Sequence, residues 1–303
     1  MIRYLKHTEI DRQKWDDCIL RSVNSLVYAQ SWYLDRVSPG WEALEEGDYQ
    51  SVFPLPCKRK WGIPYLAQPF FTQQLGLFST AHLTPDLVSR FIRAIPARFR
   101  LVDIHLNSMN KVDSSVAAIE VRSNHELELL PSYADLSGHY STNVRRNLRK
   151  ALDAGVSVRR KVAPEELVNL FRNNFGAKEG KLAYRHYMMI LSVIQESLAT
   201  AKGIVLGAYG TGVHPDAAAF FLKDHFRYIM LLAASDFSTR QNGAMFLLLD
   251  TFIREHAGEP LILDFEGGND PNLGRFYKSF GARETTYPFL RIRRFPFGCV
   301  NEP

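Results

Sequence analysis

The sequence predicts a mixed α/β fold that is divided into two domains, and three observations lead to this prediction. The chain has 303 residues, enough for one large domain or two of ordinary size. Hydrophobic residues make up 46% and charged residues 23%, the balance of a chain that folds around a sizeable core. Helical and strand-like patterns alternate along the whole length, which is typical of mixed sheets covered by helices.

The first half begins with helical patterns and continues as short strands. In residues 9–22 the side chains of Ile10, Trp15 and Ile19 recur near helical spacing. Further helices are expected at 30–36 and 85–94, and strands at 42–46, 50–58, 64–67, 74–78, 101–106, 117–122 and 126–129. The polar stretch 131–138 suggests a boundary, which gives an N-terminal domain 1–133 and a C-terminal domain 134–303.

The second half has clearer signals. A basic helix over 142–154 is followed by Gly155, a residue favoured just past a helix end. Pro164 opens another helix, with two glutamates in its first turn. Further helices are expected at 184–201, 243–256 and 271–280, and strands at 156–162, 204–209, 217–223, 227–234, 261–265 and 284–294.

Composition and termini narrow the class of protein. No segment approaches the roughly 18 apolar residues of a membrane helix, and the first residues meet a charge too early for a signal peptide. A cytoplasmic protein with no membrane span is expected. The three cysteines lie far apart and no two histidines have metal-ligand spacing, so neither a metal site nor a cysteine nucleophile is expected. The net charge of +5 permits an anionic ligand without requiring nucleic acid.

The loop before the helix at 243–256 reads SDFSTRQNGA over residues 235–244. It resembles the phosphate-binding pattern Q/R-x-x-G-x-G/A of GNAT acyltransferases, with Arg240 and Gly243 in register and Met245 departing at the last position. The resemblance implies a site for acetyl-CoA or another acyl-CoA at Arg240, Gln241, Asn242, Gly243 and Ala244. Independently of the family, a glycine at a helix start lets a phosphate approach unpaired backbone N–H groups. An ordinary loop capped by Asn242 is the alternative.

A second motif, RFYKSFGA over residues 275–282, resembles the closing helix of the GNAT fold. The resemblance implies that Tyr277 is the general acid toward the leaving thiolate, a role that suits a phenol with a pKa near 10. Leu273 departs from the family at a small-residue position. A core tyrosine between Phe276 and Phe280 is the alternative.

Three longer stretches, 68–76, 140–151 and 261–268, extend the resemblance over nearly the full length. They resemble the Fem-like branch of the GNAT superfamily, which implies two GNAT-like domains in tandem. Fem-type enzymes transfer amino acids from aminoacyl-tRNA to peptidoglycan precursors, and other relatives use coenzyme A or carrier-protein thioesters. The present chain is short and shows no long charged hairpin of the kind that contacts tRNA in some members.

Glu266 is the candidate catalytic base. It closes an apolar strand and precedes Gly267 and Gly268, which leave room over the backbone. Partial desolvation at such a strand end raises the pKa of a carboxylate toward a useful value. A structural ion pair with an arginine such as Arg240 is the alternative, and Asp264 is expected to be structural.

Five residues are candidates for substrate binding. Gln73 and Gln74 lie beside aromatic residues, Lys178 and Lys181 lie in a glycine-bearing loop, and Arg145 lies on the basic helix. A buried turn, a flexible surface loop and a solvated helix face are the respective alternatives.

Together these residues predict an acyltransferase that moves an acyl group from a thioester donor to an amine acceptor bound between the two domains. The acceptor is expected to be a small molecule or an envelope precursor, and the donor carrier to be coenzyme A, a carrier protein or tRNA. One alternative is an aminoacyl-tRNA-dependent transferase acting on a cell-envelope precursor. A second alternative is a non-catalytic binding module on a GNAT fold.

Overall fold

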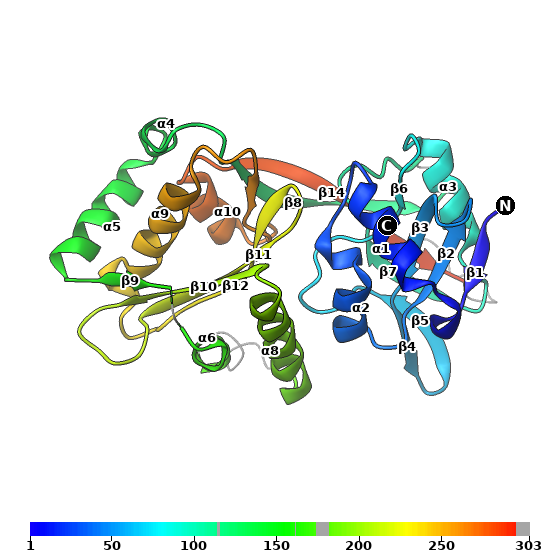
Figure 1. Cartoon of the computed structure of the whole chain (residues 1–303), viewed down its shortest axis with the longest axis horizontal. Coiled ribbons are helices and arrows are strands. Elements are labelled where there is room, and N and C mark those ends of the chain that lie inside the picture. Colours follow the sequence, from blue (N-terminus) through cyan, green and yellow to red (C-terminus); the bar gives the residue numbers. More distant parts are fainter. Residues whose placement is uncertain (114–115, 161, 174–181, 295–303) are drawn as a thin grey trace, which may run out of the picture. The chain divides into compact units, whose positions relative to one another are not determined.

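A computed structural model describes residues 1–113, 116–160, 162–173 and 182–294, which form two compact units (Figure 1). Unit 1 comprises Met1–Arg122 and the C-terminal segment from Thr286, and unit 2 comprises Ser123–Thr285. The strands β8 (Ala118–Glu128) and β14 (Arg283–Arg293) each begin in one unit and end in the other. The boundary expected at 133/134 falls at the start of α4 (Tyr133–Gly138), and the division into domains 1–133 and 134–303 stays a prediction.

Unit 1 contains an antiparallel sheet in the order β1–β2–β3–β6 and a second group of strands in the order β4–β5–β7–β14. The bounds are β1 (Arg3–Leu5), β2 (Glu42–Glu46), β3 (Ser51–Leu55), β4 (Cys57–Lys60), β5 (Ile63–Ala67), β6 (Phe78–Ser79) and β7 (Leu101–His105). Its helices are α1 (Arg12–Arg21), α2 (Ser31–Val37) and α3 (Pro85–Ala94). Thr84 caps α3 through the N–H of Leu87, and Pro85 occupies the first turn, where a missing N–H does no harm. Phe91 and Ile92 of α3 are buried with strand residues in the core of this unit.

Unit 2 is a sheet with helices on both faces. Its strands follow the order β8–β13–β12–β11–β10–β9, in which only β12 and β13 run parallel. The bounds are β9 (Ser157–Arg159), β10 (Gly203–Tyr209), β11 (Ala217–Lys223), β12 (Arg227–Ser235), β13 (Ile262–Asp264), α5 (Thr142–Asp153), α6 (Pro164–Phe171), α8 (Tyr184–Ala199), α9 (Ala244–His256) and α10 (Pro271–Lys278). Figure 1 shows α5 and α9 on one face of the strands and α6 and α8 on the other.

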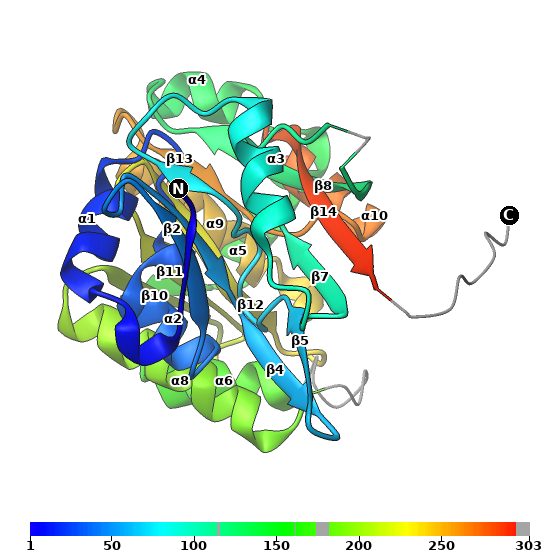
Figure 2. The same cartoon turned by 90° about the vertical axis from the view of Figure 1, so that its right-hand side faces the viewer.

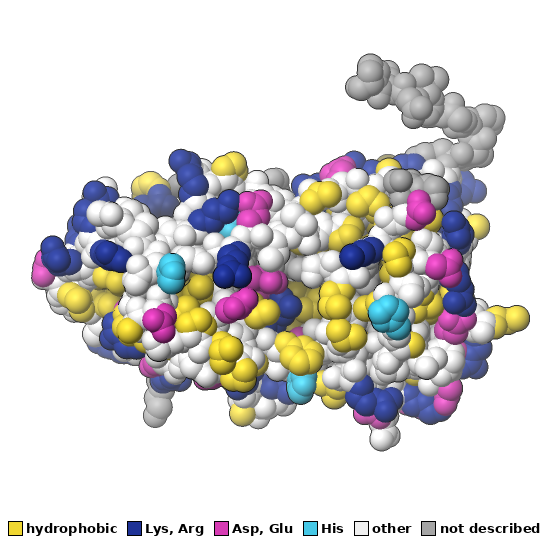
Figure 3. Space-filling view, turned by 90° about the horizontal axis from the view of Figure 1, so that it is seen from above, with side chains coloured by type: hydrophobic (Ala, Val, Ile, Leu, Met, Phe, Trp, Pro, Cys, Tyr) yellow, Lys and Arg dark blue, Asp and Glu magenta, His cyan; other side chains and the backbone are white. Residues whose placement is uncertain are grey.

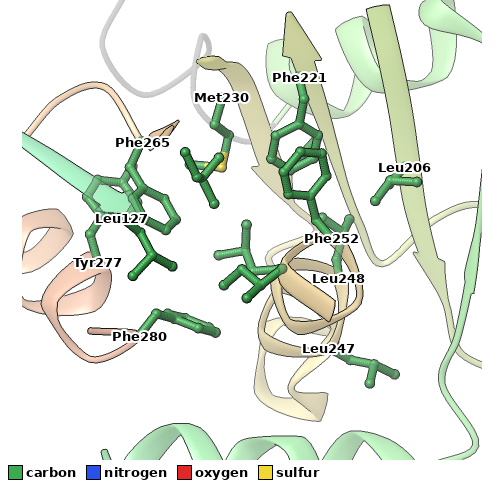
Figure 4. Packing of buried hydrophobic residues seen from close by; sticks show 14 of the residues in the cluster. Leu127, Leu206, Phe221, Met230, Leu247, Leu248, Phe252, Phe265, Tyr277 and Phe280 are labelled. Atoms are coloured by element: carbon green, nitrogen blue, oxygen red, sulfur yellow. The ribbon is translucent and has the colours of Figure 1, made fainter. Parts of the chain in front are cut away.

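The main core of unit 2 lies between the sheet and α9 (Figure 4). Phe252 of α9 stacks on Phe221 of β11 with ring centroids 3.7 Å apart. The same cluster extends to Phe265 and Tyr277, so the end of β13 and the helix α10 are fixed by apolar packing.

The mixed α/β class expected from the sequence is confirmed, and most elements lie close to their predicted bounds. The helix expected at 142–154 is α5, with Ser141 as its N-cap. One difference matters for the site, since the two strands expected at 117–122 and 126–129 form the single strand β8. Among the described residues, no helix is both long and apolar enough to cross a membrane.

Candidate active site

The parallel strands β12 and β13 separate soon after they pair. Their register covers only Arg227–Ile229 against Ile262–Asp264, while β12 continues along β11 to Ser235. A β-bulge places Leu231 as one extra residue in β12 at this point, opposite Phe220 and Phe221 of β11. Bulges often lie next to active sites, because they re-aim side chains and leave ladder groups unpaired. Ligands of open α/β sheets bind outside the carboxyl ends of parallel strands, so the segments that follow β12 and β13 are the places to look.

The segment that follows β13 is a strained turn. Glu266, Gly267 and Gly268 have φ angles of 50°, 66° and 128°. Only glycine adopts such angles without a cost in conformational energy, so Glu266 is the residue of this turn whose backbone is strained. The carboxylate of Asp264 accepts a hydrogen bond from the N–H of Glu266 at 3.0 Å, which holds the turn. Strain of this kind concentrates at functional sites.

The carboxyl group of Glu266 has an unusual proton affinity. Burial raises the pKa of Glu266 to about 8, although the residue as a whole is half-buried. An ion pair with Arg240, the structural alternative, would lower that pKa instead. Arg240 is exposed, and its guanidinium lies over the ring of Phe237 at 4.8 Å. A carboxyl whose pKa is raised toward neutrality by burial has the proton affinity that a general base requires.

Tyr277 lies beside this turn, within the core of unit 2. It is 7% exposed, and its ring stacks on Phe265 with centroids 4.8 Å apart (Figure 4). Burial raises the pKa of Tyr277, and the negative charge of Glu266 raises it further. The two groups are thus within electrostatic range of each other, and the phenol stays protonated at all physiological pH values. The assignment of Glu266 and Tyr277 as catalytic residues stays a prediction.

Asp264 anchors a buried ionic network beneath the turn. Arg227 donates to the carboxylates of Glu126 and Asp264, in each case at 2.8 Å, and Asn124 donates to Asp264 at 3.0 Å. Burial raises the pKa of Glu126, and the charge of Asp264 adds to the shift while Arg227 opposes it. Asp264 is 1% exposed, and its bonds to Arg227, Asn124 and Glu266 fix the end of β13.

His125 of β8 is a residue of this region that the sequence analysis did not select. It is 1% exposed, and neither ring nitrogen forms a hydrogen bond of normal geometry. Its ring centroid lies 5.9 Å from that of Tyr277. Burial lowers the pKa of His125, and the charge of Lys278 lowers it further, while the backbone of Gly267 and the charge of Glu284 oppose the shift. Burial thus favours the neutral form of the ring.

Two glycines make room for the His125 ring. A Cβ atom at Gly268 would lie 2.6 Å from Nδ1, and one at Gly274 would lie 3.1 Å from Cε1. The sequence could have indicated this position. Side chains that alternate between the two faces of a strand through Asn124, His125 and Glu126 are compatible with one continuous strand. His125 was missed because the strand was divided at this position.

One N–H group at the N-terminus of α9 is bound by the chain itself. The side chain of Asn242 accepts from the N–H of Ala244 at 2.9 Å and donates to the carboxylate of Asp216 at 2.7 Å. Gly243 has a φ of 81°, and a Cβ atom there would collide with the carbonyl oxygen of Asn147 on α5. The glycine thus serves the close packing of α5 against α9. Gln241 is exposed, like Arg240, and the coenzyme-binding role of residues 240–244 stays a prediction.

The residues selected for substrate binding are dispersed. Gln73 and Gln74 are buried in unit 1, where Gln74 donates to Gln73 at 2.8 Å and accepts from the N–H of Ser108 at 2.9 Å. Arg145 is exposed on α5 in unit 2, and it donates to the carbonyl of Gly138 at 2.8 Å. Lys178 and Lys181 lie outside the described residues. All five assignments stay predictions.

A cavity of about 650 Å³ adjoins the ionic network in unit 2. It is lined by Glu126, Leu127, Glu128, Pro131, Leu136, His139, Ile262, Lys278, Gly281, Ala282, Arg283 and Thr285. Neither Glu266 nor Tyr277 lines it. Its walls carry both signs of charge, including Glu128 and Arg283 at 3.7 Å.

Comparison with known families defines the class of protein. Residues 138–279 match the family model of the acetyltransferase (GNAT) domain. This stretch is therefore similar to GNAT acetyltransferase domains, and the resemblance inferred from the sequence is confirmed.

Solved structures extend this result to the fold of the whole chain. FemX superposes with a TM-score of 0.68 at 12% identity, over 95% of this chain and 97% of that one. A conserved protein of unknown function from Bacteroides thetaiotaomicron gives 0.64 at 10% identity, over 96% and 99%. L-PGS from Bacillus licheniformis gives 0.52 at 10% identity, over 86% and 87%. The fold is thus Fem-like. A search of curated protein sequences gave no significant match.

Proposed function

We propose that the chain transfers an acyl group to an amine at the turn that follows β13. The observation that carries the proposal is the carboxyl of Glu266, which has a pKa of about 8 and lies within electrostatic range of Tyr277, whose phenol is protonated before the reaction. A base that ionises near neutral pH and an acid that carries its proton into the reaction are the two proton-transfer groups that aminolysis of an ester or thioester needs.

In this mechanism the amine nitrogen forms a bond to the acyl carbonyl carbon, and the bond from that carbon to the carrier oxygen or sulfur breaks. The carboxylate of Glu266 accepts the proton that the amine loses. The phenol of Tyr277 donates a proton to the leaving oxygen or sulfur. The β-bulge at Leu231 supplies backbone N–H groups to polarise the carbonyl.

A tRNA-borne aminoacyl donor is the first candidate. The exposed face of α5 carries Arg145, Arg146, Arg149 and Lys150 against one acidic residue, Asp153. Figure 3 shows Lys and Arg side chains gathered at the left, over the part of unit 2 that includes α4 and α5. A basic helix face suits a phosphate backbone. The Fem-like fold supports the same donor, since Fem-type enzymes use aminoacyl-tRNA, and an envelope precursor is then the corresponding acceptor.

The donor is tested by filter binding of charged tRNA between 50 and 200 mM salt. We expect binding that weakens steeply with salt, because each neutralised phosphate releases counterions. The double variant Arg145→Gln/Arg149→Gln should weaken binding and reduce the salt slope by about 2. Arg21→Gln, an exposed arginine of unit 1, is the control and should change neither.

A coenzyme A thioester is the second candidate, favoured by the match of residues 138–279 to an acetyltransferase domain. Thermal-shift titration with acetyl-CoA tests it, because a ligand at about 100 times its dissociation constant stabilises a fold by about 2.7 kcal/mol. A shift that disappears in Arg240→Ala would establish this donor over tRNA. A protein that binds neither donor would be a binding module on a GNAT fold, and the proposed transfer would be wrong.

A further inference from the structure

The turn between β4 and β5 in unit 1 exposes a tryptophan that the proposed transfer step does not use. Lys60 pairs with Ile63 across the hairpin, so Trp61 and Gly62 form a two-residue turn. Figures 1 and 2 show this turn at the outer end of the hairpin. The side chains of Trp61 and Ile63 are 88% and 53% exposed.

The register of the hairpin separates an inner and an outer face. Cys57 pairs with Leu66, and these two side chains pack on the core of unit 1, where Leu66 is fully buried. Lys58 pairs with Tyr65, so by strand alternation Lys58, Tyr65, Lys60 and Ile63 share the opposite face. The ammonium of Lys58 also lies 5.6 Å from the ring of Phe70. We call the set Lys58, Lys60, Trp61, Ile63, Tyr65 and Phe70 the outer hairpin surface.

Charge on this hairpin has one sign. Between residues 57 and 71 the sequence has Lys58, Arg59 and Lys60 and no Asp or Glu. Lys60 lies over the ring of Trp61 at 4.7 Å, so charge and aromatic surface are presented together. A partner that covers this surface must accept both an apolar indole and a cluster of cations.

The backbone at the tip holds Trp61 in a conformation that bulky residues rarely adopt. Trp61 has a φ of 51° and Gly62 a φ of 79°, as both central residues of a type I′ turn require. Asparagine is favoured at the first of these positions, and tryptophan is not. A strained, exposed tryptophan that the fold does not need is best explained by a binding role.

We propose that the outer hairpin surface docks the protein on a membrane that contains anionic lipids. Tryptophan and tyrosine favour the headgroup region of a bilayer, and lysines near the surface are attracted by acidic headgroups. The aliphatic side chain of Ile63 can enter the acyl boundary, whereas it offers no surface for stacking a base. The geometry therefore favours a lipid surface over a nucleic acid.

Co-sedimentation of the full chain with vesicles tests the proposal independently of any transfer reaction. We expect binding to phosphatidylcholine vesicles that contain a quarter phosphatidylglycerol and much weaker binding to pure phosphatidylcholine. Lys58→Gln/Lys60→Gln should weaken partition to the anionic vesicles roughly 25-fold, about fivefold for each charge. Trp61→Asn should weaken it roughly tenfold, yet fold at least as stably, because Asn-Gly suits the turn.

Brominated lipids give a direct readout, because they should quench part of the tryptophan fluorescence of the native chain and much less of it in Trp61→Asn. Arg146→Gln/Lys150→Gln on α5 is the matched control for charge. The proposal is overturned if the native chain does not bind anionic vesicles, or if the α5 control weakens vesicle binding as much as the hairpin variants. It is also overturned if Trp61→Asn lowers tRNA binding while leaving vesicle binding intact.

Discussion

The segments that follow β12 and β13 in unit 2 differ in backbone conformation and in the hydrogen bonds that hold them. At the N-terminus of α9, Asn242 caps the first N–H group and Asp216 accepts from Asn242. In the turn that follows β13, Glu266 has a raised pKa in a strained conformation. His125 has two buried nitrogens without normal hydrogen bonds.

The difference bears on which of the two segments takes part in the proposed chemistry. A buried polar group without a partner costs about 1–3 kcal/mol, and native proteins retain few of them without a functional reason. The α9 terminus matches the family motif better, and its coenzyme-binding role stays a prediction. The turn after β13 matches a weaker pattern, and its role in proton transfer, on which the proposed function rests, is likewise a prediction.

The largest expected effect is on turnover. Glu266→Gln keeps the size of the side chain and removes the base, and it should lower the rate of acyl transfer roughly 100-fold or more. Steady-state kinetics with the donor that binds measure this, and Glu255→Gln, a surface residue paired with Arg160, is the control. Unchanged turnover in Glu266→Gln would show that Glu266 is not the catalytic base.

Gly243→Ala should cost roughly 3 kcal/mol of unfolding free energy, measured by urea denaturation. About 1–2 kcal/mol comes from the positive φ, and the rest from the collision with the carbonyl of Asn147. Gly258→Ala isolates the first contribution, since Gly258 has a φ of 88° and open space around its Cβ position. Equal losses of unfolding free energy in Gly243→Ala and Gly258→Ala would mean that α5 does not pack closely against Gly243.

His125→Leu should raise the unfolding free energy by up to about 2 kcal/mol, because it removes two buried nitrogens without hydrogen bonds of normal geometry. It should also lower turnover, because the ring packs beside Tyr277, with centroids 5.9 Å apart, and helps to position the proposed acid. His105→Leu in unit 1 is the matched comparison. The Nδ1 of His105 lies 2.9 Å from the carbonyl oxygen of Gln73, so this variant should be destabilised. A His125→Leu protein that is less stable and fully active would make His125 a structural residue.

Asn242→Ala is expected to give the smallest effect, a loss of about 1 kcal/mol from the missing helix cap with turnover nearly unchanged. Thermal denaturation and the transfer assay measure the two quantities. A large loss of turnover with normal stability would instead assign the α9 terminus to the donor.

Local patterns predicted the elements of this fold well, and the site less completely. The bounds of α5 and α9 follow from helical spacing and from Gly155 and Gly243, which are local signals. Glu266 could be selected as a candidate for the same reason, because it is a carboxylate between an apolar strand and two glycines, and its catalytic role stays a prediction. Gly243 packs against Asn147 on another helix, and the residues next to Gly243 in the sequence do not indicate such a contact.

His125 illustrates the same limit. Its pattern was visible in the strand, but its environment depends on Gly268, Gly274 and Tyr277, which the fold brings to it from distant positions. The charge state of a side chain depends on burial, and burial is a property of the fold and not of the motif.

The central claim, that the turn after β13 holds a carboxyl group poised for proton transfer, is tested most directly by stability as a function of pH. Glu266 has a folded pKa of about 8 and an ordinary value of 4.5, so the folded state retains a proton that the unfolded state has lost. The unfolding free energy should therefore fall as pH rises from about 4.5 to 8, and level off above that. Denaturant titrations of the native chain and of Glu266→Gln, compared at each pH, isolate this contribution. The account predicts that the native chain loses stability relative to Glu266→Gln across this range, and a difference that stays constant with pH would contradict it.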